Sequence, residues 1–293
     1  MDMTMENREA NVFDQVLAGL SERGLDLATT QVRKNNGSRT GVHVKGMNVS
    51  PTVYKDQVEC YVKANGLPEA INFYESVLTN EVPVFDVNRI VSRDYILENG
   101  IPCVVQRKGN EELLDGLVST DYLDLAVYYR IILDADLARV GETASVSIKP
   151  EMLTMAGINR DELHEAAAGN LHPVMFHMNE LLQEMIGAGC APLPEETATM
   201  LVVTNESKYQ GAANIINTKI FKDISDDMDS DLWILPSSIH ELIVVPCDQF
   251  EHGDADELRD MVTTINAEQV APEDQLSDSV YRYIREQNAV EIC

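Results

Sequence analysis

Two short apolar runs, Leu232–Leu235 and Leu242–Val245, constrain the fold more strongly than any other stretch of the chain. Asp231, Pro236 and Pro246 bound them, and apolar runs of this length between such residues are typical of buried strands rather than helices. Because the connection between the two runs is short, antiparallel pairing is the only economical geometry for them. The sequence therefore predicts a buried antiparallel pair whose connecting residues lie at one end of a sheet.

The connection between these runs carries the polar side chains Ser237, Ser238, His240 and Glu241. A serine nucleophile needs a base that takes its proton, and the base needs a carboxylate that orients it, so these residue types suit a hydrolase. His240 and Glu241 are adjacent, however, and adjacent strand residues point to opposite faces, so these two should not pair directly. Neither serine lies in a GxSxG elbow. In the simpler interpretation, the hydroxyls and the imidazole hydrogen-bond to the turn backbone at a buried strand end.

The rest of the chain alternates between helical periodicity and extended runs. Before residue 187, helices are expected at 5–22, 57–64, 67–79, 87–97, 110–117 and 160–169, and strands at 25–32, 41–47, 49–54, 101–106, 122–133 and 144–148. After residue 197, the expected order is strand, strand, helix, strand, strand, helix, beginning with strands at 200–203 and 212–216 and a helix at 218–228. This mixture predicts an α+β fold with mixed, mainly antiparallel sheets and packed helices.

Glycine and proline cluster between residues 187 and 194, which is the composition of a linker. We therefore expect two subdomains, an N-terminal α+β region at 1–187 and a C-terminal α+β region at 197–293. The segment 188–196 would join them.

Arg33 and Lys34 belong to a locally basic turn at 33–37, in which an Asn-Gly pair signals a β-hairpin. Solvation of the hairpin is the simpler interpretation of these charges, and binding of an anion or carboxylate is the alternative. Asn205 and Lys208, after the first C-terminal strand, are the other candidate binding residues.

Two regions were weighed as metal sites, and neither has the required ligand spacing. His164, His172 and His177 lie where we expect helix, including a methionine-rich core face at 175–186, but they lack the HExxH spacing of a zinc site. The aspartates at 227–231 resemble the start of a calcium loop that lacks its glycine and its final glutamate. No phosphate-binding glycine loop occurs either, so the sequence predicts no metal and no cofactor.

Composition limits the classes of partner. The chain of 293 residues is 44% hydrophobic, so it can bury a sizeable core, and its net charge of −27 disfavours binding to nucleic acid. The N-terminus lacks the apolar core of a secretory signal, and no apolar run is long enough to cross a membrane. The five cysteines are scattered and odd in number, so we expect reduced thiols in a cytoplasmic protein.

Several segments together resemble one known family. They are MLVVTNES, GAANII, SDLWILPSSIHELIVVP and INAEQVAPEDQLSDSVYRY, with KNNG and NVSPTVY far upstream. The chain looks like a member of an uncharacterised bacterial family that is catalogued only as a domain of unknown function. The resemblance covers most of the chain and implies a bacterial, intracellular protein, but it brings no catalytic residues.

Two functional hypotheses follow from the sequence. The first is a non-enzymatic cytoplasmic protein that binds another protein or a small ligand, because no complete catalytic motif is present. The second is a hydrolase-like enzyme that uses Ser237 or Ser238 with His240. A serine oxygen within hydrogen-bonding distance of the imidazole would favour the enzyme.

Overall fold

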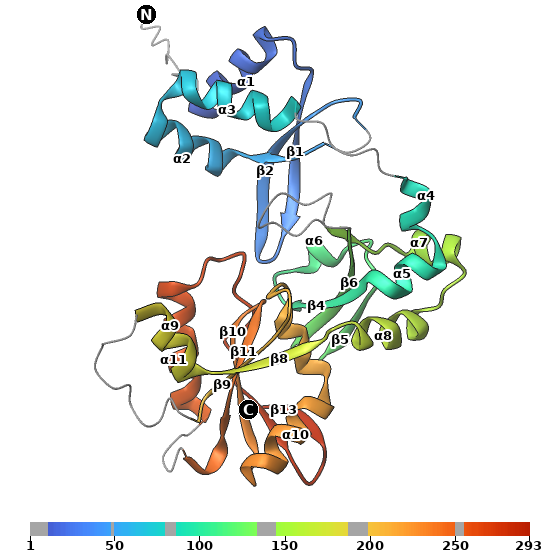
Figure 1. Ribbon diagram of the computed structural model, residues 1–293, viewed down its shortest axis with the longest axis vertical. Helices are drawn as coiled ribbons and strands as arrows, with labels where there is room; N and C mark the ends of the chain where they lie inside the picture. The colour runs from blue at the N-terminus through green and yellow to red at the C-terminus, as the bar shows by residue number, and fades with distance from the viewer. Residues whose placement is uncertain (1–10, 48–49, 80–85, 134–144, 187–198, 250–254) are drawn as a thin grey trace, which may run out of the picture. The chain divides into compact units, whose positions relative to one another are not determined.

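The computed structural model describes residues 11–47, 50–79, 86–133, 145–186, 199–249 and 255–293 (Figure 1). The chain divides into two compact units, Met1–Asp86 and Val87–Cys293. Helices and open, antiparallel sheets make up both units, so the predicted α+β class is confirmed. None of the helices in these described ranges is long and apolar enough to cross a membrane.

The first unit packs helices against a three-stranded antiparallel sheet in the order β1-β2-β3. Its elements are α1 (Val12–Glu22), β1 (Leu27–Lys34), β2 (Gly37–Val44), β3 (Val53–Tyr54), α2 (Lys55–Asn65) and α3 (Leu67–Thr79). Asn11 caps α1, since its side-chain oxygen accepts the Phe13 N–H at 3.0 Å. Asn36 takes the left-handed conformation in the hairpin turn, with φ of 57°. The turn is therefore Asn35-Asn36, one residue earlier than the predicted Asn-Gly pair.

The second unit contains a four-stranded sheet built around β6. Its strands are β4 (Gly100–Gln106), β5 (Ser119–Tyr122), β6 (Leu125–Ile132) and β7 (Ser145–Ser147). β4 pairs along the whole of β6, whereas β5 and β7 pair with its first and second halves. The helices of this part are α4 (Val87–Ile90), α5 (Arg93–Asn99), α6 (Glu111–Leu114), α7 (Pro150–Ala156) and α8 (Arg160–Gly169). The predicted capping box of α8 is present, because Asn159 and Glu162 exchange both hydrogen bonds.

The second unit also contains a six-stranded antiparallel sheet in the order β13-β12-β10-β11-β9-β8. Its strands are β8 (Pro173–His177), β9 (Leu201–Asn205), β10 (Leu232–Ser238), β11 (Glu241–Pro246), β12 (Tyr281–Ile284) and β13 (Ala289–Ile292). The accompanying helices are α9 (Met178–Ile186), η3 (Gly211–Ile216), α10 (Thr218–Met228), η4 (Cys247–Gln249) and α11 (Ala255–Gln269). The apolar runs that constrain the sequence form the central strands β10 and β11, as predicted.

The six-stranded sheet is covered on both faces by helices of the second unit. Leu235 packs with Leu258 and Val262 of α11 in one cluster. The opposite face of the sheet carries Tyr283 of β12. Its ring centroid lies 6.0 Å from that of Phe221 in α10. Burial on both faces explains why β10 and β11 read as continuous apolar runs rather than alternating ones.

A carboxylate joins the two sheets of the second unit. Asp124, in the turn between β5 and β6, accepts hydrogen bonds from the hydroxyls of Ser277 at 3.1 Å, Ser279 at 2.8 Å and Tyr281 at 2.7 Å. Burial, with a further contribution from Asp124, raises the pKa of Tyr281, so its hydroxyl remains a donor. The segment QLSDSVYRY thus supplies the three hydroxyls that hold the four-stranded sheet to the six-stranded one.

Two predicted elements are wrong in type, and a third is divided. The run 212–216, predicted as a strand, lies in the 3₁₀ helix η3. Residues 173–177, placed in a helical region by their methionine spacing, form strand β8, which pairs with β9. The helix expected at 87–97 is two short helices, α4 and α5. For β8, pairing with β9 overrides local periodicity.

The predicted linker at 188–196 lies outside the described residues. The contacts divide the chain between Asp86 and Val87, and β8 and β9 pair from either side of the segment 188–196. Residues on both sides of the expected boundary therefore share one sheet. That 188–196 is an exposed linker remains a prediction, which limited proteolysis tests directly.

Candidate functional site at the β10–β11 turn

The four polar residues of the predicted site lie together at the end of the central hairpin. β10 and β11 pair antiparallel, with an irregularity in register between Pro236 and Ser238, and the turn residues are Ile239 and His240. Ile239 is buried and its N–H donates to the carbonyl of Asp274 at 2.8 Å. The turn is therefore held by a backbone hydrogen bond to the segment that contains Asp274.

Neither serine hydroxyl bonds to the imidazole. Ser238 Oγ accepts the backbone N–H of His240 at 3.0 Å, and Ser237 Oγ donates to Glu241 Oε1 at 3.1 Å. These bonds are of the kind by which hydroxyls satisfy turn backbone and neighbouring side chains. Ser237, Ser238, His240 and Glu241 thus lie near one another without forming a nucleophile–base pair.

Both ring nitrogens of His240 have partners elsewhere in the unit. Nδ1 accepts the backbone N–H of Gln210 at 3.2 Å, and Nε2 lies 3.4 Å from Asp274 Oδ1. Because the Gln210 N–H can only donate, the ring proton is assigned to Nε2, facing the carboxylate. The imidazole side chain is 33% exposed, so it lies at the rim of the fold with both nitrogens engaged.

A close approach of the β9–η3 loop to the turn produces this arrangement. A Cβ at Gly211 would lie 2.3 Å from Thr204 Oγ1 and 2.4 Å from the carbonyl oxygen of His240. Only glycine fits there, and its absence of a side chain lets Thr204 Oγ1 donate to that carbonyl at 2.7 Å. The segment GAANII is thus a docking point for the hairpin turn.

The candidate binding residues Asn205 and Lys208 belong to the same loop. The Asn205 side chain donates to the carbonyl of Tyr209 at 2.7 Å and accepts from Ser207 and the Tyr209 N–H, so it shapes the loop. Lys208 is exposed, and its ammonium lies 5.5 Å from the ring centroid of Phe176.

The other two candidates, Arg33 and Lys34, lie in the first unit at the end of β1. Arg33 is exposed, and the Lys34 ammonium lies 5.2 Å from the ring centroid of Tyr54. That ring also faces the guanidinium of Arg39, at 4.2 Å. Lys34 and Arg39 therefore face one aromatic side chain of the first unit.

The histidines weighed as metal ligands are dispersed in the structure. His164 Nδ1 lies 2.8 Å from the Tyr129 hydroxyl. His172 precedes strand β8 and has a positive φ of 43°, and His177 is the last residue of that strand. Within the described part of the chain, no group of three metal-ligating residues is found.

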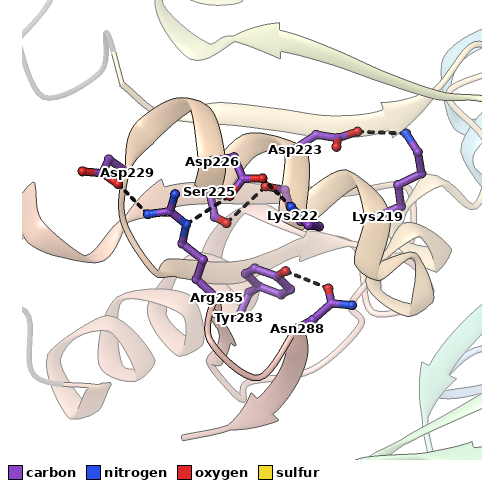
Figure 2. Close-up of polar contacts among 9 residues, drawn as sticks. All are labelled: Lys219, Lys222, Asp223, Ser225, Asp226, Asp229, Tyr283, Arg285 and Asn288. Carbon is purple, nitrogen blue, oxygen red and sulfur yellow. Dashed lines mark hydrogen bonds and ion pairs between the residues drawn. The ribbon is translucent and has the colours of Figure 1, made fainter.

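Asp229, one of the aspartates that resemble a calcium loop, is paired with an arginine (Figure 2). Arg285 contacts Asp226 at 3.1 Å and Asp229 at 2.5 Å, and its backbone N–H donates to Asp231 at 3.0 Å. Lys222, one turn before Asp226 on α10, contacts the same carboxylate at 2.5 Å. These contacts tie the end of α10 to the β12–β13 hairpin and use the oxygens that a cation would need.

Comparison with known proteins gives one assignment. Residues 9–285 match the profile of a family of unknown function, DUF5688. The chain belongs to this family. No curated protein and no solved structure matches it.

The sequence of this DUF5688 chain did not reveal the partners that complete the site. Gln210, Tyr209 and Asp274 reach the turn from segments about 30 residues away on either side. The ring of Tyr209 lies 5.8 Å from that of His240, and its hydroxyl lies 3.2 Å from Ser145 Oγ, 64 residues earlier. The glycine of QGAAN was the one local signal of a close backbone approach.

Proposed function

We propose that this chain is a non-enzymatic cytoplasmic protein that binds a small ligand. One observation supports this most directly. Both nitrogens of His240 are engaged, by the Gln210 N–H and the Asp274 carboxylate, and neither neighbouring hydroxyl reaches the ring. A general base must offer an unprotonated nitrogen within hydrogen-bonding distance of the proton it removes. His240 offers none to Ser237 or Ser238.

Two buried amide oxygens beside the turn support binding rather than a purely structural role. Gln210 Oε1 and Asn214 Oδ1 accept no hydrogen bond from any residue that the structure describes, although the residues are only 4% and 0% exposed. A buried acceptor without a donor costs about 1–3 kcal/mol. A ligand that supplies a donor to this region would recover part of that free energy.

Active-site labelling distinguishes this proposal from the hydrolase alternative. We expect a fluorophosphonate probe, which reacts with activated serines, to leave the wild-type protein unlabelled. Labelling of Ser237 or Ser238 that disappears in His240→Ala would overturn the proposal and establish the hydrolase. Ser207→Ala serves as a control for reaction at an exposed hydroxyl of the adjacent loop.

The cytoplasmic part of the proposal rests on the thiols. Cys60, Cys103, Cys247 and Cys293 are free. Alkylation of the freshly isolated protein under denaturing, non-reducing conditions should label all five cysteines of the sequence. Labelling of three or fewer would indicate a disulfide and an oxidising compartment.

A further inference from the structure

Arg130 is a half-buried cation whose hydrogen bonds go to neutral groups. It lies on β6 opposite Ser147 of β7. Its Nε donates to Ser145 Oγ at 2.9 Å, Nη1 to Ser147 Oγ at 3.1 Å and Nη2 to the Ser145 carbonyl at 3.2 Å. Within the described ranges, no carboxylate lies within ion-pair distance of this guanidinium.

The side chains of Cys103 and Tyr128, also beside Arg130 in the described part of the chain, supply no negative charge either. Burial raises the pKa of the Cys103 thiol to about 12, so the thiol stays protonated. Burial also raises the pKa of Tyr128, whose hydroxyl lies beside the guanidinium. A half-buried guanidinium that is satisfied only by neutral acceptors keeps its full charge for an incoming anion.

Hydrogen-bond donors converge beside this charge. A guanidinium has five N–H groups, and three of those of Arg130 are used by Ser145 and Ser147. Ser147 Oγ already accepts from Arg130, so its own O–H can donate elsewhere. Ser145 Oγ accepts from Nε and lies 3.2 Å from the Tyr209 hydroxyl, so when Ser145 donates to that oxygen the phenolic O–H is also available.

We infer that Arg130, Ser147 and Tyr209 bind the carboxylate group of a small organic acid. All three residues are partly exposed, which is a requirement for a site that a ligand enters from solvent. Partial burial strengthens the ion pair relative to one in bulk water. This assignment rests on the proposed function, because it names the ligand class of a non-enzymatic binding protein.

Charge balance favours a carboxylate over a phosphate. A single guanidinium among neutral hydroxyls compensates one negative charge, whereas a phosphate brings close to two at neutral pH. The net charge of −27 further disfavours a multiply charged anion. Tyr209 and Ile132 pack against the cluster formed by Ile101, Cys103, Val105, Leu114, Ala126 and Tyr128, so an apolar ligand body would contact apolar side chains.

Nuclear magnetic resonance of ¹⁵N-labelled arginine side chains tests the site. Sodium propionate and sodium benzoate are titrated against the wild-type protein in a buffer without carboxylates, with inorganic phosphate and chloride at equal ionic strength. We expect the carboxylates to shift the Arg130 Nε–H resonance saturably and phosphate to bind more weakly. Absence of a saturable shift with either carboxylate, or tighter binding of phosphate, would overturn the inference.

Variants assign the effect to named groups. Arg130→Gln should weaken propionate binding about 10- to 100-fold, and Tyr209→Phe and Ser147→Ala should each weaken it several-fold because each removes one donor. Arg160→Gln, an exposed change of the same charge, should leave the affinity unchanged. A thermal melt first establishes whether Arg130→Gln folds. If this variant does not fold, the propionate affinities of Tyr209→Phe and Ser147→Ala test the site.

Unchanged affinity in Tyr209→Phe and Ser147→Ala would refute the site whatever the behaviour of Arg130→Gln. Serine labelling by the fluorophosphonate probe bears on the proposed function alone. The two failures are therefore distinguishable.

Discussion

Two arginines of the second unit are surrounded in opposite ways. Arg285 is 37% exposed in its side chain and contacts the carboxylates of Asp226 and Asp229. Arg130 is half-buried and donates to the oxygens of Ser145 and Ser147. Exposed carboxylates neutralise the outer cation. The inner cation is held by neutral groups, and no carboxylate of the described residues compensates its charge.

Asp124 is the negative counterpart of Arg130. Its carboxylate accepts from three hydroxyls, and no cation pairs with it in the described residues. The second unit therefore has two kinds of ionic side chain. Arg285 pairs with opposite charges at the surface, whereas Arg130 and Asp124 are partly buried and hydrogen-bond to neutral oxygens. Exposed ion pairs contribute little to stability, whereas hydrogen bonds to a partly buried charge contribute more. Variants at the two kinds of position should differ accordingly.

The largest effect is expected for Asp124→Ala. It leaves the hydroxyls of Ser277, Ser279 and Tyr281 without their acceptor and removes three hydrogen bonds between the β5–β6 turn and the segment that leads into β12. We expect a loss of about 2–4 kcal/mol in the free energy of unfolding, measured by urea denaturation. Asp121→Ala is the matched control, because that side chain is 75% exposed and pairs only at the surface with Arg107. Equal losses of unfolding free energy in Asp124→Ala and Asp121→Ala would show that the partly buried carboxylate contributes no more to stability than the exposed one.

Asp124 also shows how far the sequence predicts the structure. The apolar runs of β10 and β11, the helix α10 and the capping box of α8 follow from local periodicity and capping residues, so they were predictable. The acceptor of the three hydroxyls lies 153 residues before Ser277, and no local pattern indicates such a pair. The run GAANII looked like a strand because it is short and apolar, yet Gly211 packs against Thr204 and the turn as a 3₁₀ helix.

The same limit applies to the candidate site. Its polar turn was predicted, because proline and serine between two apolar runs signal a connection at a strand end. The contacts of His240 were not predicted, because its partners Gln210 and Asp274 come from other segments of the chain. No sequence pattern indicated a role for Arg130. Its partners Ser145 and Ser147 lie on another strand, β7, and local periodicity does not predict which strands pair.

His240→Ala tests a partly exposed side chain that contacts both a backbone N–H and a carboxylate. Its removal leaves the Gln210 N–H without an acceptor and releases Asp274. Because the imidazole is partly exposed, water replaces some of the lost bonding, and we expect a loss of about 1–2 kcal/mol. A thermal melt against His177→Ala, an exposed histidine, measures it. An unchanged melting temperature would indicate that the turn is a functional site instead of a scaffold.

Arg285→Gln should have a smaller effect than either of these changes. The guanidinium is exposed, and exposed ion pairs are weakened by side-chain entropy and by salt. We expect only a slight decrease of the urea midpoint at low ionic strength, and no difference from wild type in about 1 M NaCl, where the Debye length is about 3 Å. A large decrease that persists at high salt would show that the surface cluster is structural.

The smallest expected effect is a change in acid stability at the surface cluster. Lys222 and Arg285 hold the pKa of Asp226 below its ordinary value of 3.8. A carboxyl whose pKa is lowered in the folded state stabilises the fold above pH 3.8, and this contribution disappears as the pH falls through the folded-state pKa. Asp226→Asn should therefore make the urea midpoint fall less steeply below pH 4 than in wild type. The Cys103 thiol beside Arg130 does not titrate in that range, since its pKa is about 12, so Arg130→Gln should leave the slope unchanged. If Arg130→Gln alters the slope and Asp226→Asn does not, a titrating carboxylate lies at the inner site and the contrast between the two arginines is wrong.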